Sequence, residues 1–211
     1  MSPSQDPSAD AAQSAREDLA FLKGLVDGAG RHQAATGAVF VAAGLIYGLQ
    51  MLGHWGQATG WLTLGPLGGL VLSLGPTVLF LIVLCVVLIR DRRAPRGGTA
   101  SRAFQSVFAA AGTTNLILIA IFAPAALGGG GLKVWLFYPA VVFALQGGAW
   151  LAAWMLTRRW WMGLTALGWF ACAIGMGLTI GQLSYILIAA AGLLLCMVLP
   201  GWAMMRQART A

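Results

Sequence analysis

The chain has few charged residues, and none lies within its long apolar stretches. Charged residues make up 9% of the 211 positions and hydrophobic residues 59%, whereas soluble domains average roughly 25% charged. All six acidic residues, from Asp6 to Asp91, lie outside the apolar stretches. Ion pathways and proton relays within membranes depend on ionisable side chains. The sequence therefore lacks the usual marks of both.

Histidine is also scarce, and its placement argues against haem. Haem between transmembrane helices needs histidine ligands, but His32 and His54 border one apolar stretch and would be about 33 Å apart on a helix rising 1.5 Å per residue. They cannot bind one iron. No second ligand of the right type lies near either in sequence, so we expect no metal and no cofactor.

The apolar stretches contain no base that could activate a nucleophile. Serines occur there, but no His or carboxylate accompanies them. Gly128 to Gly131 lacks the Lys-Ser/Thr of a Walker phosphate loop. Metal-dependent lipid transferases need clustered aspartates, and beyond the N-terminal tail only Asp91 is acidic. We expect no enzymatic activity.

Cysteine is limited to three residues that stand singly in apolar runs, Cys85, Cys172 and Cys196. A thiol in such a run behaves as a small hydrophobe. The sequence predicts neither a disulfide nor a zinc site.

What the chain has in abundance is hydrophobic sequence of membrane-spanning length. About 20 apolar residues suffice for a helix to cross the hydrocarbon core. Segments of this length occur at Ala34–Trp55, Gly68–Ile89, Ala103–Ala123, Val134–Leu156, Trp161–Ile180 and Leu183–Met205. We therefore predict an all-α polytopic membrane protein with six transmembrane helices.

The basic residues predict the orientation. Twelve of the thirteen Lys and Arg residues lie in alternate gaps between the segments, and the other gaps together hold only Lys133. By the positive-inside rule, both termini face the cytoplasm. Trp55, Trp61 and Trp135 then fall at outer boundaries, while four tryptophans fall near inner ones: Trp154, Trp160, Trp161 and Trp202. Trp150 and Trp169 lie deeper in their segments, and we expect them to pack between helices. We expect a bacterial cytoplasmic membrane, with anionic inner-leaflet lipid rather than nucleic acid balancing the net charge of +7.

The N-terminal region divides into two parts before the transmembrane domain at 34–205. Residues 1–13 are too polar to form a core, and we expect a disordered tail. At 14–31 a capping-box spacing at Ser14 and Glu17 precedes an apolar stripe, which predicts a short amphipathic cytoplasmic helix. It is either an interfacial helix on the inner leaflet or a docking helix for a protein partner. The candidate docking residues are Phe21, Leu22, Leu25 and Val26. Residues 206–211 are expected to be a short cytoplasmic tail.

A few polar residues lie within the apolar segments. Thr113, Thr114 and Asn115 are mid-way along the third segment, and Gln146 is mid-way along the fourth. Counting about 1.5 Å per residue from the outer ends puts Asn115 and Gln146 at similar depth, so they could touch. Either these residues form interhelical hydrogen bonds, or they line a pocket for a small uncharged solute or a lipid headgroup.

Proline and glycine indicate how the helices pack. Pro76, Pro139 and Pro200 lie within or near the ends of segments, as ordinary kinks or as a break that forms a binding site. Gly44 and Gly48 have the four-residue spacing that lets helices approach closely. Whether such contacts form within one chain or in a homo-oligomer stays open.

The chain resembles a group of small uncharacterised bacterial inner-membrane proteins with six spans and a short cytoplasmic lead-in helix. The strings that carry the resemblance are Leu19-Ala20-Phe21-Leu22, Trp160-Trp161-Met162-Gly163 and Leu199-Pro200-Gly201. The resemblance implies a location and a topology, but no activity. We predict a non-enzymatic accessory or regulatory membrane subunit that binds a protein partner. The alternative is a permease for a small neutral or lipidic substrate.

Overall fold

The computed structural model describes residues 7–91 and 99–210, with side chains at 33–90 and 103–208. Within these ranges the regular structure is entirely helical. Its elements are α1 (Pro7–Ala58), α2 (Pro66–Asp91), α3 (Thr99–Ala125), the π-helical turn η1 (Ala126–Gly130), α4 (Gly131–Thr157), α5 (Trp160–Leu178), α6 (Leu183–Leu193), the π-helical turn η2 (Leu194–Val198) and α7 (Leu199–Thr210).

Five helical segments are long and apolar enough to cross a membrane, which indicates a multi-pass membrane protein. They are Gln33–Ala58, Pro66–Arg90, Ala103–Thr157, Trp160–Leu178 and Leu183–Ala208. The third, at 55 residues, contains α3, η1 and α4. Two of the six predicted segments therefore lie within this one continuous stretch.

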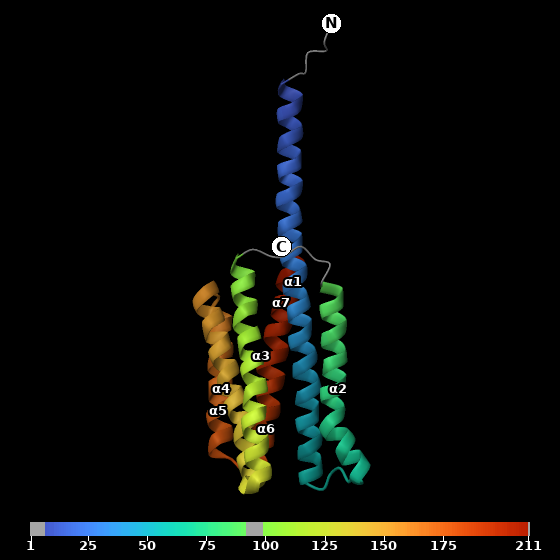
Figure 1. The fold of residues 1–211 in the computed structure, drawn as a ribbon, viewed down its shortest axis with the longest axis vertical. Helices are drawn as coiled ribbons and strands as arrows, with labels where there is room; N and C mark the ends of the chain where they lie inside the picture. The colour runs from blue at the N-terminus through green and yellow to red at the C-terminus, as the bar shows by residue number, and fades with distance from the viewer. Residues whose placement is uncertain (1–6, 92–98, 211) are drawn as a thin grey trace.

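The chain reverses direction at η1 (Figure 1). Gly129 and Gly131 have φ values of 117° and 63°, a region that residues with a Cβ rarely adopt. As a result α3 and α4 pack side by side in opposite directions. The glycine run Gly128 to Gly131, which the sequence predicts to be a flexible turn, thus lies between these two helices.

Helix α1 differs most from the sequence expectation. It is 52 residues long, begins at Pro7 rather than at Ser14, and continues without a break through Ala34. A helix already formed in the bundle can extend residue by residue without a new nucleation step, so no boundary is needed there. Its N-terminal part projects beyond the other helices (Figure 1). The side chains of the predicted docking stripe, Phe21 to Val26, lie outside the described residues, as does the backbone of residues 1–6 of the predicted tail.

The C-terminal part of α1 is the common packing partner in the bundle, in contact with α2, α6, η2 and α7. Its contact with α7 is close enough to require glycine on both sides. A Cβ on Gly37 would lie 2.6 Å from the Gly201 carbonyl oxygen, and a Cβ on Gly201 would lie 2.7 Å from the Gly37 carbonyl oxygen. Gly44 similarly faces the Leu193 carbonyl oxygen. These glycine contacts form within one chain.

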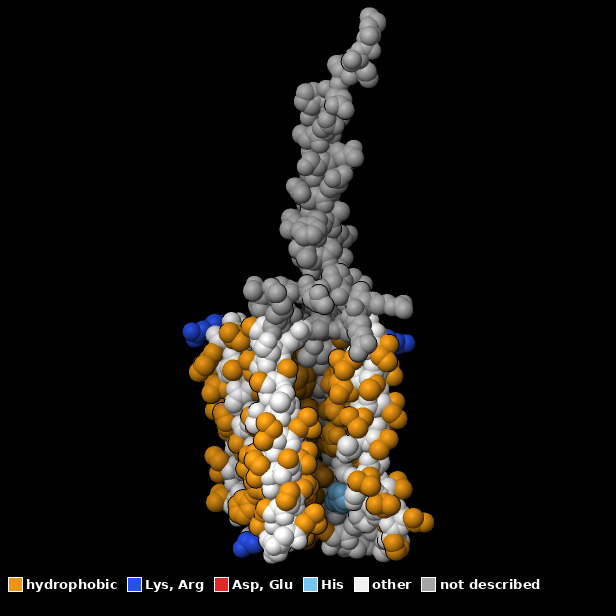
Figure 2. All heavy atoms as spheres, in the orientation of Figure 1, with side chains coloured by type: hydrophobic (Ala, Val, Ile, Leu, Met, Phe, Trp, Pro, Cys, Tyr) orange, Lys and Arg blue, Asp and Glu red, His pale blue; other side chains and the backbone are white. Residues whose placement is uncertain are grey.

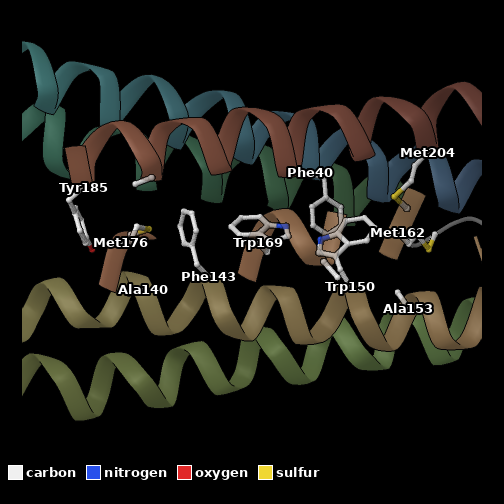
Figure 3. Close-up of a cluster of buried hydrophobic side chains, with 12 residues drawn as sticks. Phe40, Ala140, Phe143, Trp150, Ala153, Met162, Trp169, Met176, Tyr185 and Met204 are labelled. Carbon is white, nitrogen blue, oxygen red and sulfur yellow. The ribbon is translucent and has the colours of Figure 1, made fainter. Parts of the chain in front are cut away.

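The core is a row of side chains along the bundle axis (Figure 3). Trp150 and Trp169 are 0% and 1% exposed, as expected for tryptophans placed deep in their segments. Phe40 of α1 contacts Trp150 of α4, with ring centroids 5.3 Å apart, and Phe143 contacts Trp169 of α5 at 4.7 Å. Aromatic packing thus joins α1, α4 and α5.

Charged side chains lie at the two ends of the bundle, and its sides are covered by hydrophobic residues (Figure 2). Arg158 and Arg159 form the turn between α4 and α5, and Arg159 donates a hydrogen bond to Gln207 of α7. Lys133 lies in the first turn of α4, at the opposite end. We call these the arginine end and the Lys133 end. The projecting part of α1 and the C-terminus lie at the arginine end (Figure 1).

The close α1–α7 contact predicts that Gly37→Val destabilises the fold, because the added side chain would meet backbone that cannot rotate away. The expected loss is about 1–3 kcal/mol, measured by unfolding in mild detergent. Gly148→Val is the matched control, since a Cβ on Gly148 of α4 would meet nothing within 4 Å. Equal losses in both variants would contradict the assigned contact.

Candidate functional site

The predicted polar pocket does not form as a unit. Asn115 of α3 accepts a hydrogen bond from the Tyr138 hydroxyl of α4 at 2.8 Å, and not from Gln146. The Thr113 hydroxyl donates to the Ala109 carbonyl oxygen of its own helix, and Thr114 is exposed. The Asn115 oxygen thus bonds Tyr138, and the Gln146 Oε1 atom bonds no described residue. Gln146 lies two turns beyond Tyr138 on α4, and the phenol reaches the amide first.

Gln146 differs from Asn115 and Thr113 in that its side-chain oxygen has no hydrogen-bond partner among the described residues. Its Oε1 atom is buried and has no hydrogen-bond partner among the described residues, and neither has the indole Nε1 of Trp150. The two residues are one turn apart on α4, so an unpaired acceptor and an unpaired donor lie on the same part of the helix. A buried polar atom without a partner costs about 1–3 kcal/mol. This makes Gln146 the member of the predicted set with capacity left for a ligand.

One polar contact between helices lies directly at a proline. Pro200 has no N–H, so it cannot bond the carbonyl oxygen of Cys196, four residues earlier. The indole Nε1 of Trp169, from α5, donates to that oxygen at 3.2 Å. A side chain of a neighbouring helix thus supplies the donor that the proline removed.

A related arrangement occurs at Pro76 of α2 and Pro139 of α4. Near Pro76 of α2, the Gln50 amide of α1 donates to the Ser73 carbonyl oxygen at 3.0 Å. Near Pro139 of α4, the Tyr185 hydroxyl of α6 donates to the Leu136 carbonyl oxygen at 2.7 Å. Both oxygens belong to the turn that precedes the proline, where the ring distorts the helical hydrogen bonds.

Sequence analysis placed the prolines but did not identify these donors. The available signal was that each interrupted helix in an apolar environment needs a donor from elsewhere. Gln50, Tyr185 and Trp169 are among the few side chains in the apolar segments that can supply one. At Pro200 the freed carbonyl oxygen is satisfied within the protein, which favours an ordinary kink there over a break that binds a ligand.

Among the described residues, no group of three or more His, Cys, Asp or Glu side chains could hold a metal ion. His54, near the C-terminus of α1, is partly buried. The arginine end presents a different chemistry, with Arg158 and Arg159 exposed and Arg206 lying 5.5 Å over the Trp202 ring. Cations above exposed tryptophan are suited to an interface between apolar and aqueous phases.

Comparison with protein-family models, curated proteins and solved structures found no match to this chain. The site can therefore be interpreted only from its own geometry.

The pairing of Trp169 with Pro200 predicts a double-mutant coupling. Trp169→Phe removes the indole donor and leaves the Cys196 carbonyl oxygen without it, whereas Pro200→Ala restores a backbone N–H that can take its place. Trp169→Phe should therefore cost about 1 kcal/mol less in the Pro200→Ala background, as measured by unfolding in detergent. The volume lost from the core is the same in both backgrounds and cancels. Identical costs would show that the indole does not compensate for the proline.

Proposed function

We propose that this chain is a non-enzymatic accessory or regulatory subunit of a bacterial cytoplasmic membrane, where it binds a protein partner through the projecting part of α1. In this proposal the chain crosses the membrane six times, with α3 and α4 as separate spans joined at η1. The arginine end faces the cytoplasm, in keeping with the positive-inside rule.

The observation that carries the proposal is the continuity of α1. One helix of 52 residues runs from the projecting part into the bundle, where it contacts α2, α6, η2 and α7. A partner bound to the projecting part would therefore hold the element on which the bundle is assembled. An isolated amphipathic helix lying on the membrane would provide no such connection.

The length of the projection supports a protein partner over a membrane surface. The apolar part of α1 begins near Ala34 in the sequence, so residues 7–33 extend about 40 Å at 1.5 Å per residue. In Figure 1 this part continues the line of the bundle helices instead of turning across its end. A helix in this direction reaches away from the bilayer, and an apolar stripe on it would meet another protein, as in helix-in-groove recognition.

Capture of a partner tests the proposal. Tagged full-length protein is purified from its native membrane in mild detergent, as wild type and as the double variant Phe21→Ser/Leu25→Ser, and proteins that co-purify are quantified by mass spectrometry. We expect one protein in near-equal amount with the wild type and a loss of at least about tenfold with the variant, because each truncated apolar side chain removes about 1.5–3 kcal/mol of burial.

Ala20→Ser is the matched control, since Ala20 lies opposite the stripe in the 3.6-residue repeat. None of these changes alters Lys or Arg, so the orientation should not change. All variants should accumulate in the membrane to the same level and unfold at the same temperature. The docking proposal fails if the wild type carries no protein, or if the double variant keeps its partner.

A second candidate function, a permease for a small neutral or lipidic substrate, rests on the unpaired Oε1 of Gln146 and Nε1 of Trp150. A donor and an acceptor without partners in an apolar core would suit an uncharged polar solute. Asn115 adds little to this function, because Tyr138 already occupies its oxygen.

Gln146→Leu separates the two functions. In an accessory subunit, the change replaces an unpaired buried amide oxygen with an apolar group of similar size, so stability in detergent should rise or stay equal. In a permease, the change should remove a solute that co-purifies with the wild type and lower stability. Asn115→Leu is the comparison, and it should lower stability by about 1 kcal/mol in either case because it breaks the bond to Tyr138.

A further inference from the structure

Two cysteines that stand far apart in the sequence lie together in the bundle. Cys172 is on α5 and Cys196 is in η2, and their thiols are neighbours. Both are free and partly buried, whereas Cys85 is exposed on α2. Sequence analysis treated all three as isolated hydrophobic residues. For Cys172 and Cys196 that interpretation overlooked a neighbouring thiol.

Two glycines account for the close approach of the sulfur atoms. Gly168 lies one turn before Cys172 on α5, and Gly192 lies one turn before Cys196 on the opposing helix. A Cβ on Gly168 would lie 2.7 Å from Cys196 Sγ, and a Cβ on Gly192 would lie 3.0 Å from Cys172 Sγ. Each sulfur therefore packs against the glycine of the other helix, and the two helices meet closely at these residues.

The backbone around Cys196 is held against α5 by a second contact. The indole of Trp169, which lies on α5 one turn before Cys172, donates its hydrogen bond to the Cys196 carbonyl oxygen. Trp169 is 1% exposed, so it has little freedom to move. The thiol pair is thus positioned both by the glycine contacts and by this bond.

We propose that Cys172 and Cys196 form a redox-active dithiol that a membrane-soluble two-electron oxidant of the quinone class converts to an intramolecular disulfide between α5 and η2. Both S–H bonds break and one S–S bond forms. The two protons and two electrons pass to the quinone, which becomes the quinol. A dithiol reductant reverses the reaction by thiol–disulfide exchange.

The location of the pair selects this class of oxidant. Both cysteines lie in segments apolar enough to cross a membrane, Trp160–Leu178 and Leu183–Ala208, where water-soluble oxidants are excluded. Both are only partly buried, so a lipid-soluble reagent can reach them from the side of the bundle. The disulfide would fix η2, a wide π-helical turn just before Pro200, to α5.

The test counts free thiols in the full-length protein. Native membranes are treated with decyl-ubiquinone or with the permeant oxidant diamide, acid-quenched, dissolved in denaturing detergent and labelled with a maleimide mass tag. Untreated protein should carry three tags, one for each cysteine. Oxidised protein should carry one, on Cys85, and dithiothreitol should restore the other two. Oxidation by diamide but not by the quinone would overturn the assigned oxidant class.

Three variants make the outcome decisive. Cys85→Ser should go from two tags to none, which shows that the remaining pair reacts within one chain. Gly168→Val should slow oxidation at least tenfold, whereas Gly177→Val on the same helix, where a Cβ meets nothing within 4 Å, should not. The proposal is overturned if all three thiols remain after treatment that oxidises added dithiothreitol in the same membranes, or if the disulfide joins two chains.

Discussion

An apolar environment gives a backbone carbonyl no solvent to bond, so every interruption of a helix must be satisfied by the protein itself. In this bundle Pro76, Pro139 and Pro200 interrupt α2, α4 and α7. A donor from another helix bonds a carbonyl oxygen in the turn before each of these prolines, namely Gln50, Tyr185 and Trp169. The three bonds join α1 to α2, α6 to α4, and α5 to η2. The polar side chains that look like candidates for a substrate site in the sequence are thus largely committed to holding the helices together.

Features set by the position of a residue along the helix axis were predictable from the sequence, whereas features set by the direction of a side chain around that axis were not. Apolar length predicted four of the apolar helical segments to within a few residues, while the third and fourth predicted segments lie within one stretch of 55 residues. Depth along the helix axis was also predictable from the rise per residue, and it correctly put Trp150 and Trp169 in the interior. The direction in which a side chain points was not. Asn115 and Gln146 were matched by depth alone, but Asn115 bonds Tyr138, and the angular positions of these residues depend on how α3 and α4 pack after the turn at η1.

The predicted boundaries of the first helix differ from those of α1 for a related reason. A capping-box spacing at Ser14 and a change in composition near Ala34 predict two elements, because local sequence rules treat each segment by itself. In the structure the packed part of α1 lies against four other elements, and the helix continues from there to Pro7. Tertiary packing stabilises the helix more than intrinsic propensity does, and glycines at 24, 28 and 30 do not end it. The same continuity gives the projecting part a direct mechanical connection to the core, which local sequence cannot reveal.

Where two helices lie close together, only small residues fit between them. The same close contacts determine which side chains, including the cysteines, lie next to the glycines. Gly37 and Gly201 bring α1 and α7 to backbone distance, while Gly168 and Gly192 leave room for the cysteine side chains between α5 and the helix that carries Cys196. Small residues are needed at such contacts for packing alone. At the second contact, however, a sulfur atom lies beside each glycine, together with the Phe143 ring at Gly192. A serine or alanine would fill that space as well, so packing alone does not require two thiols there. A reaction between the two side chains, by contrast, does require thiols.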